Sequence, residues 1–338
     1  MDNITTASPT DGDEDVVVYP TYAYRVVYAT LIGIISVVGI IGNTFVILGV
    51  IVYKKLRTKT NVFVVNLSGA DLVNCLNLPW MSVAVLSADG WPLPKGICSF
   101  ASVALLVSIG SSLYSLGGIA LCRCALVTMN PTDYANFLTR RRLACLTVVV
   151  WIVPLAVSLM PLTFAPNFLG FNNKYDMCIW DTNHWFSMTY NVILSICCFP
   201  LPLSVIVVSY ARIWRHVRRH AQRMTRVSAR SVSGIVDGNG ARKGSVNRRQ
   251  MAVTINMLIV ICIFLICMTP YSMILVLPGG EIVVPAFGVI LLSNSCINPL
   301  IYATRHPDFK LAFAKVLRCK TRELMSERSR AQNTQSQK

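Results

Sequence analysis

The stretch CSFASVALLVSIGSSLYSLGGIALCRC, from Cys98 to Cys124, decides the fold of this chain. It is long, apolar and rich in small residues, and its one charged residue, Arg123, lies near one end. As a helix with a rise of about 1.5 Å per residue, it places Cys98 and Arg123 roughly 37 Å apart. A hydrocarbon core is about 30 Å thick, so we expect the cysteine at the outer face of a membrane and the arginine at the cytoplasmic face.

The composition of the whole chain also indicates a membrane protein. Of 338 residues, 54% are hydrophobic and only 14% are charged, too few charges for an ordinary soluble surface. The twelve cysteines show no spacing typical of a zinc site, and we interpret most of them as small buried hydrophobic residues. We therefore predict an all-α integral membrane protein.

Seven apolar stretches are each long enough to cross a bilayer. They lie near residues 25–53, 61–87, 97–128, 143–164, 186–213, 251–277 and 282–304. We predict a seven-helix transmembrane bundle over residues 23–304, with an extracellular tail over residues 1–22. A short interfacial helix is expected over residues 305–319, because apolar residues recur there at helical spacing with lysines between them. Residues 320–338 are polar and predict a disordered cytoplasmic tail.

The net charge of +16 carries topological information. Basic residues gather in alternate connections: after the first span, before the fourth, between the fifth and sixth, and after the seventh. Because basic loops stay in the cytoplasm, we predict an extracellular N-terminus and a cytoplasmic C-terminus, in the plasma membrane. Nucleic-acid binding is not indicated, since these basic residues lie on loops that are fixed to a membrane.

Two short motifs indicate modification near the chain ends. Asn3 begins Asn-Ile-Thr, a glycosylation acceptor on the predicted outer side, although such a short motif also recurs by chance. Cys319 follows the interfacial helix at a juxtamembrane position suited to palmitoylation, with a free surface thiol as the alternative. Membrane lipids are therefore expected partners of this end.

A few polar side chains interrupt the apolar spans. Asp71 is the only acidic residue in the core of any predicted span, and an ionisable group in hydrocarbon usually faces the interior of the bundle. We expect Asp71 and its polar neighbours to form a sodium site or a proton relay, and a purely structural hydrogen-bonded cluster is the alternative. We expect no other cofactor. Its predicted members are Asp71, Ser112, Asn294, Ser295 and Asn298, with Asn43 at compatible depth.

An ordered set of motifs occurs along the chain, each at its own predicted span or loop. The set comprises Gly42-Asn43, Leu67 to Leu72, Trp91, Cys98, Ile119 to Cys124, Trp151, Phe199 with Pro202 and Tyr210, Phe264 with Pro270, and Asn298-Pro299-Leu300-Ile301-Tyr302. Together these motifs resemble the rhodopsin-like, class A, G-protein-coupled receptors over nearly the whole chain. The stretch from Asp89 to Leu93 and the run Gly118 to Ala120 look most like melatonin receptors and the related invertebrate receptor Moody.

This resemblance implies a receptor with no catalytic chemistry. Binding of a small molecule in an outer pocket would shift the sixth span and activate a heterotrimeric G protein, which the melatonin-receptor resemblance suggests is of the inhibitory type. The resemblance also implies a disulfide between Cys98 and Cys178, the two cysteines placed outside, where disulfides persist. The activation residues that it implies are Arg123, Tyr210, Phe264, Met268, Pro270, Asn298, Pro299 and Tyr302.

Two features depart from the family pattern. Family members usually carry an acidic residue immediately before the arginine of the third span, where this chain has Cys122, and often another near the start of the sixth span, where Gln250 and Met251 stand. An arginine without these partners predicts raised basal signalling. Met268 stands where a tryptophan is usual, which predicts a less rigid relay from the ligand to the sixth span.

The expected ligand pocket is mostly apolar, and it suits a small lipophilic or neutral ligand. No aspartate stands at Leu105, where amine receptors carry one, and no lysine stands at Leu292, where a retinal Schiff base would form. Arg25 and Lys174 near the outer mouth offer positive charge to an acidic head group, with solvated charge as the alternative. The expected pocket residues are Leu105, Leu106, Ile109, Asn191, Leu194, Ser195, Tyr271, Ile274, Gly288 and Leu292.

Two other interpretations stay open from the sequence. A seven-span transporter or channel would use Asp71 as its ion site, but we find no inverted repeat and no glycine-broken half-helix that would favour it. A receptor-like protein that no longer signals is consistent with Cys122 and Met268. The identity of the ligand and the oligomeric state do not follow from the sequence.

Overall fold

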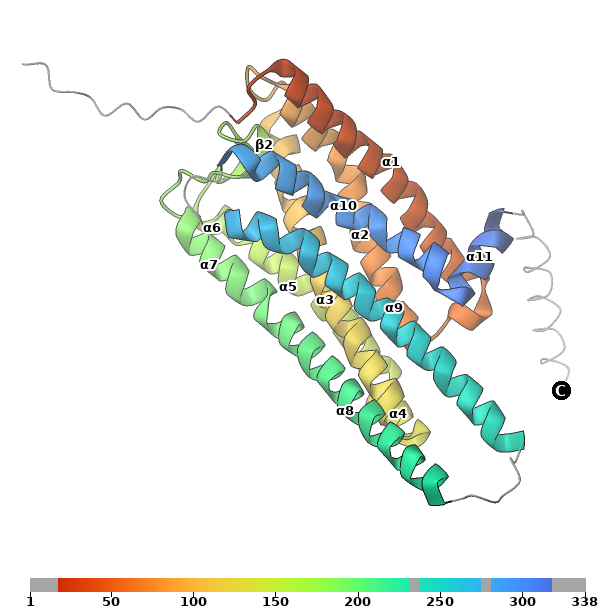
Figure 1. Ribbon diagram of the computed structural model, residues 1–338. Helices are drawn as coiled ribbons and strands as arrows, with labels where there is room; N and C mark the ends of the chain where they lie inside the picture. Colours follow the sequence, from red (N-terminus) through yellow and green to blue (C-terminus); the bar gives the residue numbers. More distant parts are fainter. Residues whose placement is uncertain (1–17, 231–237, 275–280, 318–338) are drawn as a thin grey trace, which may run out of the picture.

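The computed structural model describes residues 18–230, 238–274 and 281–317. Asn3, Cys319 and the expected C-terminal tail lie outside the described residues. Within this part of the chain, seven helical spans are long and apolar enough to cross a membrane, which confirms the predicted seven-span bundle. The spans run side by side in an elongated bundle (Figure 1).

The spans and connections follow in chain order. The spans are α1 (Tyr22–Val52), α2 (Lys59–Leu86), α3 (Lys95–Thr128), α5 (Arg140–Leu159), α7 (Ser187–Cys198) continued by α8 (Pro200–Arg230), α9 (Gly238–Ile274) and α10 (Val284–Arg305). The connections contain η1 (Lys54–Leu56), α4 (Pro131–Phe137), α6 (Pro161–Phe164), β1 (Leu169–Asn172), β2 (Met177–Trp180) and η2 (Glu281–Val283), and α11 (Pro307–Leu317) follows α10.

Local sequence explains where several helices begin and break. Thr58 caps α2 by accepting a hydrogen bond from the Asn61 N–H (3.3 Å). Thr139 caps α5 in the same way by accepting from the Arg142 N–H (3.4 Å). The fifth span is divided between α7 and α8 at Phe199, because the next residue, Pro200, has no backbone N–H to continue the helical ladder.

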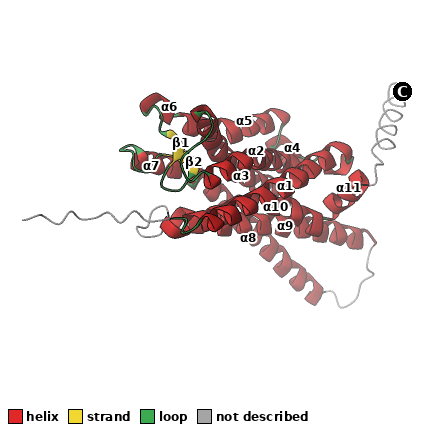
Figure 2. Cartoon of the chain, turned by 90° about the horizontal axis from the view of Figure 1, so that it is seen from above, coloured by secondary structure: helices red, strands yellow, loops and turns green. Residues whose placement is uncertain are grey.

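A small antiparallel sheet lies between α6 and α7, and the all-α prediction did not include it. β1 pairs with β2 so that Phe171 stands opposite Cys178. All four residues of β2 are buried, because the hairpin packs against α3 and β2 also packs against α2. Figure 2 shows the hairpin at one end of the bundle, beside α6 and α7.

α3 is the central helix of the bundle. It packs against α2, α5, α8, α9 and both strands, and 67% of its most apolar window is buried, the largest share among the seven spans. Small residues permit this close packing. A Cβ added at Gly110 would stand 2.7 Å from the Cβ of Pro154 on α5, closer than side chains normally approach.

The short helix expected after the seventh span is present as α11. It follows α10 after a bend at His306 and packs back against α1 and α10. The Phe309 ring is fully buried and stacks on Tyr302, with ring centroids 5.2 Å apart. The existence of this helix is thus confirmed, and its contact with a lipid surface stays a prediction.

We predict that Gly110→Ala destabilises the bundle by about 1–3 kcal/mol, the usual cost of overpacking, because the rigid Pro154 ring cannot move aside. The measurement is the melting temperature of the purified protein in detergent. Gly33→Ala is the matched control, since a Cβ at Gly33 meets nothing within 4 Å. An equal melting temperature for Gly110→Ala and the wild type would contradict the close α3–α5 packing.

Candidate functional site

A cavity lies among α3, α7, α9 and α10, beneath β2. Nine of the ten residues expected from the sequence line it, and Ile274 is not among its lining residues. No charged side chain is among the described residues that line this cavity. Its polar lining comes from Asn191, Ser195, Ser272 and the partly buried, hydroxyl-bearing ring of Tyr271, and Leu105 and Leu292 line the same space.

The sequence interpretation missed the residues of the hairpin that cover this cavity. Met177, Ile179 and Trp180 of β2 line the cavity, and all three are buried. Their proximity to Cys178 was the available signal, because a bond from Cys178 to Cys98 brings its neighbours over the outer end of α3. The cavity therefore has a roof made by the chain itself.

The roof is attached to α3 by covalent and polar contacts. Cys98 and Cys178 form a disulfide, as the resemblance implied. The Ser99 hydroxyl donates to the Leu169 carbonyl (2.8 Å) at the start of β1. The Ser102 hydroxyl lies 3.3 Å from the Ile179 carbonyl of β2. The hairpin is thus held at several points along one helix.

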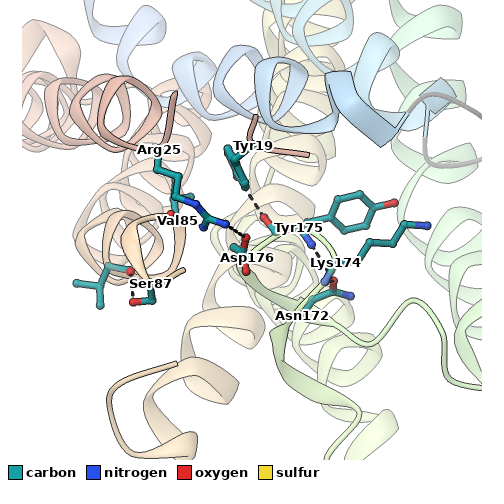
Figure 3. Close-up of polar contacts among 9 residues, drawn as sticks. Tyr19, Arg25, Val85, Ser87, Asn172, Lys174, Tyr175 and Asp176 are labelled. Atoms are coloured by element: carbon teal, nitrogen blue, oxygen red, sulfur yellow. Dashed lines mark hydrogen bonds and ion pairs between the residues drawn. The ribbon is translucent and has the colours of Figure 1, made fainter. Parts of the chain in front are cut away.

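A second set of contacts fastens the roof to the start of α1 (Figure 3). Arg25 forms an ion pair with Asp176 at 2.8 Å and donates to the Val85 carbonyl of α2 (3.0 Å). The Tyr19 hydroxyl donates to the Tyr175 carbonyl (3.1 Å), and the Arg25 guanidinium lies 4.7 Å from the centre of the Tyr19 ring. We call Tyr19, Arg25, Tyr175 and Asp176 the outer clasp.

The outer clasp corrects one expectation from the sequence. Arg25 is already bound to Asp176 and Val85, so it does not offer a free charge to an acidic ligand at the mouth. The Lys174 ammonium lies 5.8 Å from the centre of the Tyr175 ring, on the same loop. Burial raises the pKa of Asp176 above its usual range, while Arg25 opposes that rise.

Deeper in the bundle, Asp71 of α2 lies in a polar cluster that joins three helices. The Asn298 side chain donates to one carboxylate oxygen of Asp71 (2.8 Å) and the Ser112 hydroxyl donates to the other (3.2 Å). Asn294 and Ser295 line the same small cavity as Asp71 and Ser112. The structure therefore brings together all five residues of the predicted sodium site.

Two further side chains join this cluster: Asn43, which the sequence placed at compatible depth, and Asn74, which it did not predict. Asn74 donates to the Ser295 hydroxyl (3.0 Å), and Asn43 donates to the Ser295 carbonyl (2.8 Å). The side-chain oxygens of Asn74, Asn294 and Asn298 are buried and accept no hydrogen bond from the described residues. Several unsatisfied oxygens beside a carboxylate are ligands that a hard cation prefers, so the residues fit a bound Na⁺.

At the inner end of α3, Arg123 is 6% exposed and Cys122 is fully buried. Within the described part of the chain, the Nε of Arg123 and the hydroxyls of Tyr210 and Tyr302 have no hydrogen-bond partner. Tyr302, Cys122, Phe264 and Met268 belong to one hydrophobic core, against which Tyr210 packs. Pro270 and Pro299 lie inside α9 and α10.

These sites are stacked along α3 and are connected by shared walls. Ile109, Leu291 and Leu292 line both the outer cavity and the small cavity at Asp71. On α9, Met268 lines the outer cavity and Phe264, one turn further along, lines the small cavity. A change in the outer cavity can therefore reach Asp71 through side chains that touch both spaces.

Comparison with known proteins identifies a family and several relatives. The family model described as "7 transmembrane receptor (rhodopsin family)" matches residues 42–302. The dog histamine H2 receptor is 27% identical over 88% of this chain and 80% of its own length. The mouse alpha-1D adrenergic receptor is 28% identical over 83% of this chain and 55% of its own length.

Two rhodopsins are also similar. A Gq-coupled rhodopsin of Mizuhopecten yessoensis is 29% identical over 85% of this chain and 58% of its own length. The crystal structure of squid rhodopsin has the same fold, with a TM-score of 0.75 at 20% identity, over 93% of this chain and 96% of that chain.

We predict that Asp176→Asn loosens the roof, because it removes the ion pair with Arg25. The partly buried pair is worth about 1 kcal/mol, so amide hydrogen exchange in β2 should become roughly fivefold faster. Asp181→Asn is the control. It removes the same charge directly after the end of β2, and the asparagine keeps a side-chain oxygen that accepts from the Asn183 N–H. Equal exchange rates in both variants would contradict a fastening role for the clasp.

Proposed function

The chain belongs to the rhodopsin family of seven-transmembrane receptors, and we propose that its outer cavity binds a small, lipophilic or neutral ligand. As a member of this family it is a multi-pass membrane protein and a G-protein-coupled receptor, not an enzyme. Ligand binding shifts the balance between inactive and active conformations, and the active one engages a heterotrimeric G protein.

The observation that carries the ligand class is the absence of charge among the described lining residues of the outer cavity. A buried cationic ligand needs a carboxylate partner, because an unpaired charge in a low-dielectric site is costly. Asn191, Ser195 and Ser272 supply hydrogen-bonding groups without charge, which is the pattern of a site for a neutral molecule.

The same observation separates this chain from relatives that are named as histamine receptors or rhodopsins. Leu105 lines the cavity at the position where amine receptors carry an aspartate, and Leu292 lines it where a retinal Schiff base would need a lysine. Similarity to a histamine or adrenergic receptor or to a rhodopsin therefore does not support the same ligand here.

The subfamily, the G-protein subtype, the location in the cell and the modifications are not shown by the family match. The resemblance to melatonin and Moody receptors receives no support from the relatives described above, which are histamine and adrenergic receptors and a rhodopsin. The inhibitory G protein that this resemblance suggests stays a prediction for the same reason. Plasma-membrane location, the extracellular N-terminus, glycosylation at Asn3, palmitoylation at Cys319 and lipid binding are also parts of the proposal.

The transporter and channel alternative is not favoured. Residues 42–302 match a receptor family, and the fold over nearly the whole chain is that of squid rhodopsin. A receptor that no longer signals is the remaining alternative, and the next experiment tests it.

We predict that the wild-type chain stimulates guanine-nucleotide exchange on at least one purified G protein without ligand, because Arg123 has no acidic partner to hold the bundle closed. Cys122→Asp should lower this basal rate several-fold by supplying that partner, and Arg123→Ala should abolish it. A panel of G-protein subtypes identifies the transducer. No exchange with any subtype, with or without ligands, would favour the non-signalling alternative.

We also propose that the cluster around Asp71 binds Na⁺. Sodium chloride, compared with choline chloride, should raise the melting temperature of the wild type by about 2–4 °C, as expected for roughly 1 kcal/mol of linked binding. Asp71→Asn should lose the effect and Ser112→Ala should reduce it. Asp89→Asn, which lies outside the cluster, is the control; an unchanged sodium effect in Asp71→Asn would exclude this site.

A further inference from the structure

The cytoplasmic-facing end of α3 holds a buried guanidinium that the described part of the chain leaves without a partner. Arg123 is 6% exposed, and its Nε makes no hydrogen bond within the described part of the chain. A buried polar group without a partner is rare, and a buried charge without one is costly. Arg123 is therefore a group to which a bound anion would be strongly attracted.

Arg123 forms part of the wall of a cavity at this inner end. The cavity is framed by the connection between α1 and α2, by α3, by Tyr134 of α4, by Val253 of α9 and by the start of α11. Its polar lining includes Thr58, Thr60 and Asn61, besides Arg123. The Asn61 amide already donates to the Leu56 carbonyl (2.7 Å), whereas the Thr58 hydroxyl accepts from the Asn61 backbone N–H and keeps its own proton to donate to an anion.

Three more cations, all from the connection between α1 and α2, line the same cavity: Lys55, Arg57 and Lys59. Lys55 and Arg57 are exposed, and Arg57 donates to the Val50 and Ile51 carbonyls at the end of α1. The Lys59 ammonium lies 5.0 Å from the centre of the Tyr134 ring and 3.5 Å from the Ala135 carbonyl, and neither neighbour neutralises its charge.

The opposing charge in this cavity is small. Asp308, in the first turn of α11, is the one acidic residue among the described lining residues, and it already has an interaction of its own. His306, beside it, is also engaged. Four cations thus face one carboxylate, and the potential inside the cavity is positive.

We propose that this inner cavity is a binding site for a phosphate-bearing anion, with the phosphate paired to Arg123 and held from the side by Lys55 and Lys59. A planar guanidinium binds phosphate through two parallel hydrogen bonds, and ammonium groups add charge attraction without a strict geometry. Several cations around one space favour an anion with more than one phosphate group. Such an anion supplies, next to Arg123, the negative charge that an acidic residue at position 122 would give and that the Cys122 side chain lacks.

Two sources share this chemistry. A phosphoinositide head group can enter from the cytoplasmic leaflet, because the α1–α2 connection lies at the membrane end of two spans and that leaflet attracts basic groups. A soluble inositol phosphate can enter from the cytoplasm. Either anion would compete with a G protein only if the chain has the function proposed above. Binding of the anion does not depend on that function.

Direct binding to the purified full-length receptor in phosphatidylcholine nanodiscs tests the proposal. One arm adds fluorescent inositol trisphosphate to the solution, and the other adds fluorescent phosphatidylinositol bisphosphate to the nanodisc. Saturable binding in the first arm shows that a soluble phosphate suffices, and binding confined to the second arm assigns the site to the lipid. No saturable binding in either arm overturns the proposal.

A matched pair of variants distinguishes this cavity from diffuse surface charge. Lys55→Ala should weaken binding about tenfold, because it removes one charge-assisted contact. Lys54→Ala removes the same charge from the adjacent exposed residue of η1, which does not line the cavity, and should change the affinity little. Equal weakening by both variants would overturn the site.

Two variants at the floor of the cavity test the role of Arg123 itself. Arg123→Ala should reduce binding more than Lys55→Ala does. Cys122→Asp should also weaken it about tenfold, since a carboxylate beside Arg123 competes with the anion. Full affinity in a folded Cys122→Asp receptor would overturn the pairing with Arg123.

Nucleotide exchange is measured separately on the same preparations. If the receptor binds the phosphate probe but activates no G protein, the anion site is supported and the signalling function is refuted. If the receptor activates a G protein but binds neither probe, the anion site is refuted and the signalling function is not.

Discussion

The close packing of α3 against its neighbours joins every functional part of this molecule. Gly110 brings α5 so near that no Cβ fits between the helices, and the disulfide at Cys98 fastens the β1–β2 hairpin to the outer end of the same helix. The helix thereby forms one wall of the outer cavity, of the polar cluster at Asp71 and of the inner cavity at Arg123. These sites therefore share one helix, most of which is buried.

The cost of polar groups inside a bilayer explains how those sites differ. Asp71 is buried but accepts hydrogen bonds from Ser112 and Asn298, and neighbouring amide oxygens are buried without a donor in the described part of the chain. Arg123 is buried without such partners in the described part of the chain. The first site is nearly satisfied by the protein, while the second depends on a group from outside the bundle, either a binding partner or an anion.

The outer end shows the opposite arrangement, in which the chain satisfies its own charges. Arg25 and Asp176 pair with each other above the cavity, and the buried β2 strand forms the roof below them. The space beneath is left without charge among its described lining residues. A ligand that enters it therefore gains from apolar contact and a few neutral hydrogen bonds.

The sequence by itself determined the seven spans, because crossing a bilayer requires about twenty apolar residues and this requirement is written in each segment separately. It also located Asp71 and Arg123 as the unusual charges, since a charged residue in an apolar run is visible without knowing its neighbours. The roof of Met177, Ile179 and Trp180, the Arg25–Asp176 pair and the grouping of Lys55 and Lys59 with Arg123 were decided only by the tertiary structure. Each of these joins residues that are far apart in the chain, and no local pattern records which distant side chain a residue will meet.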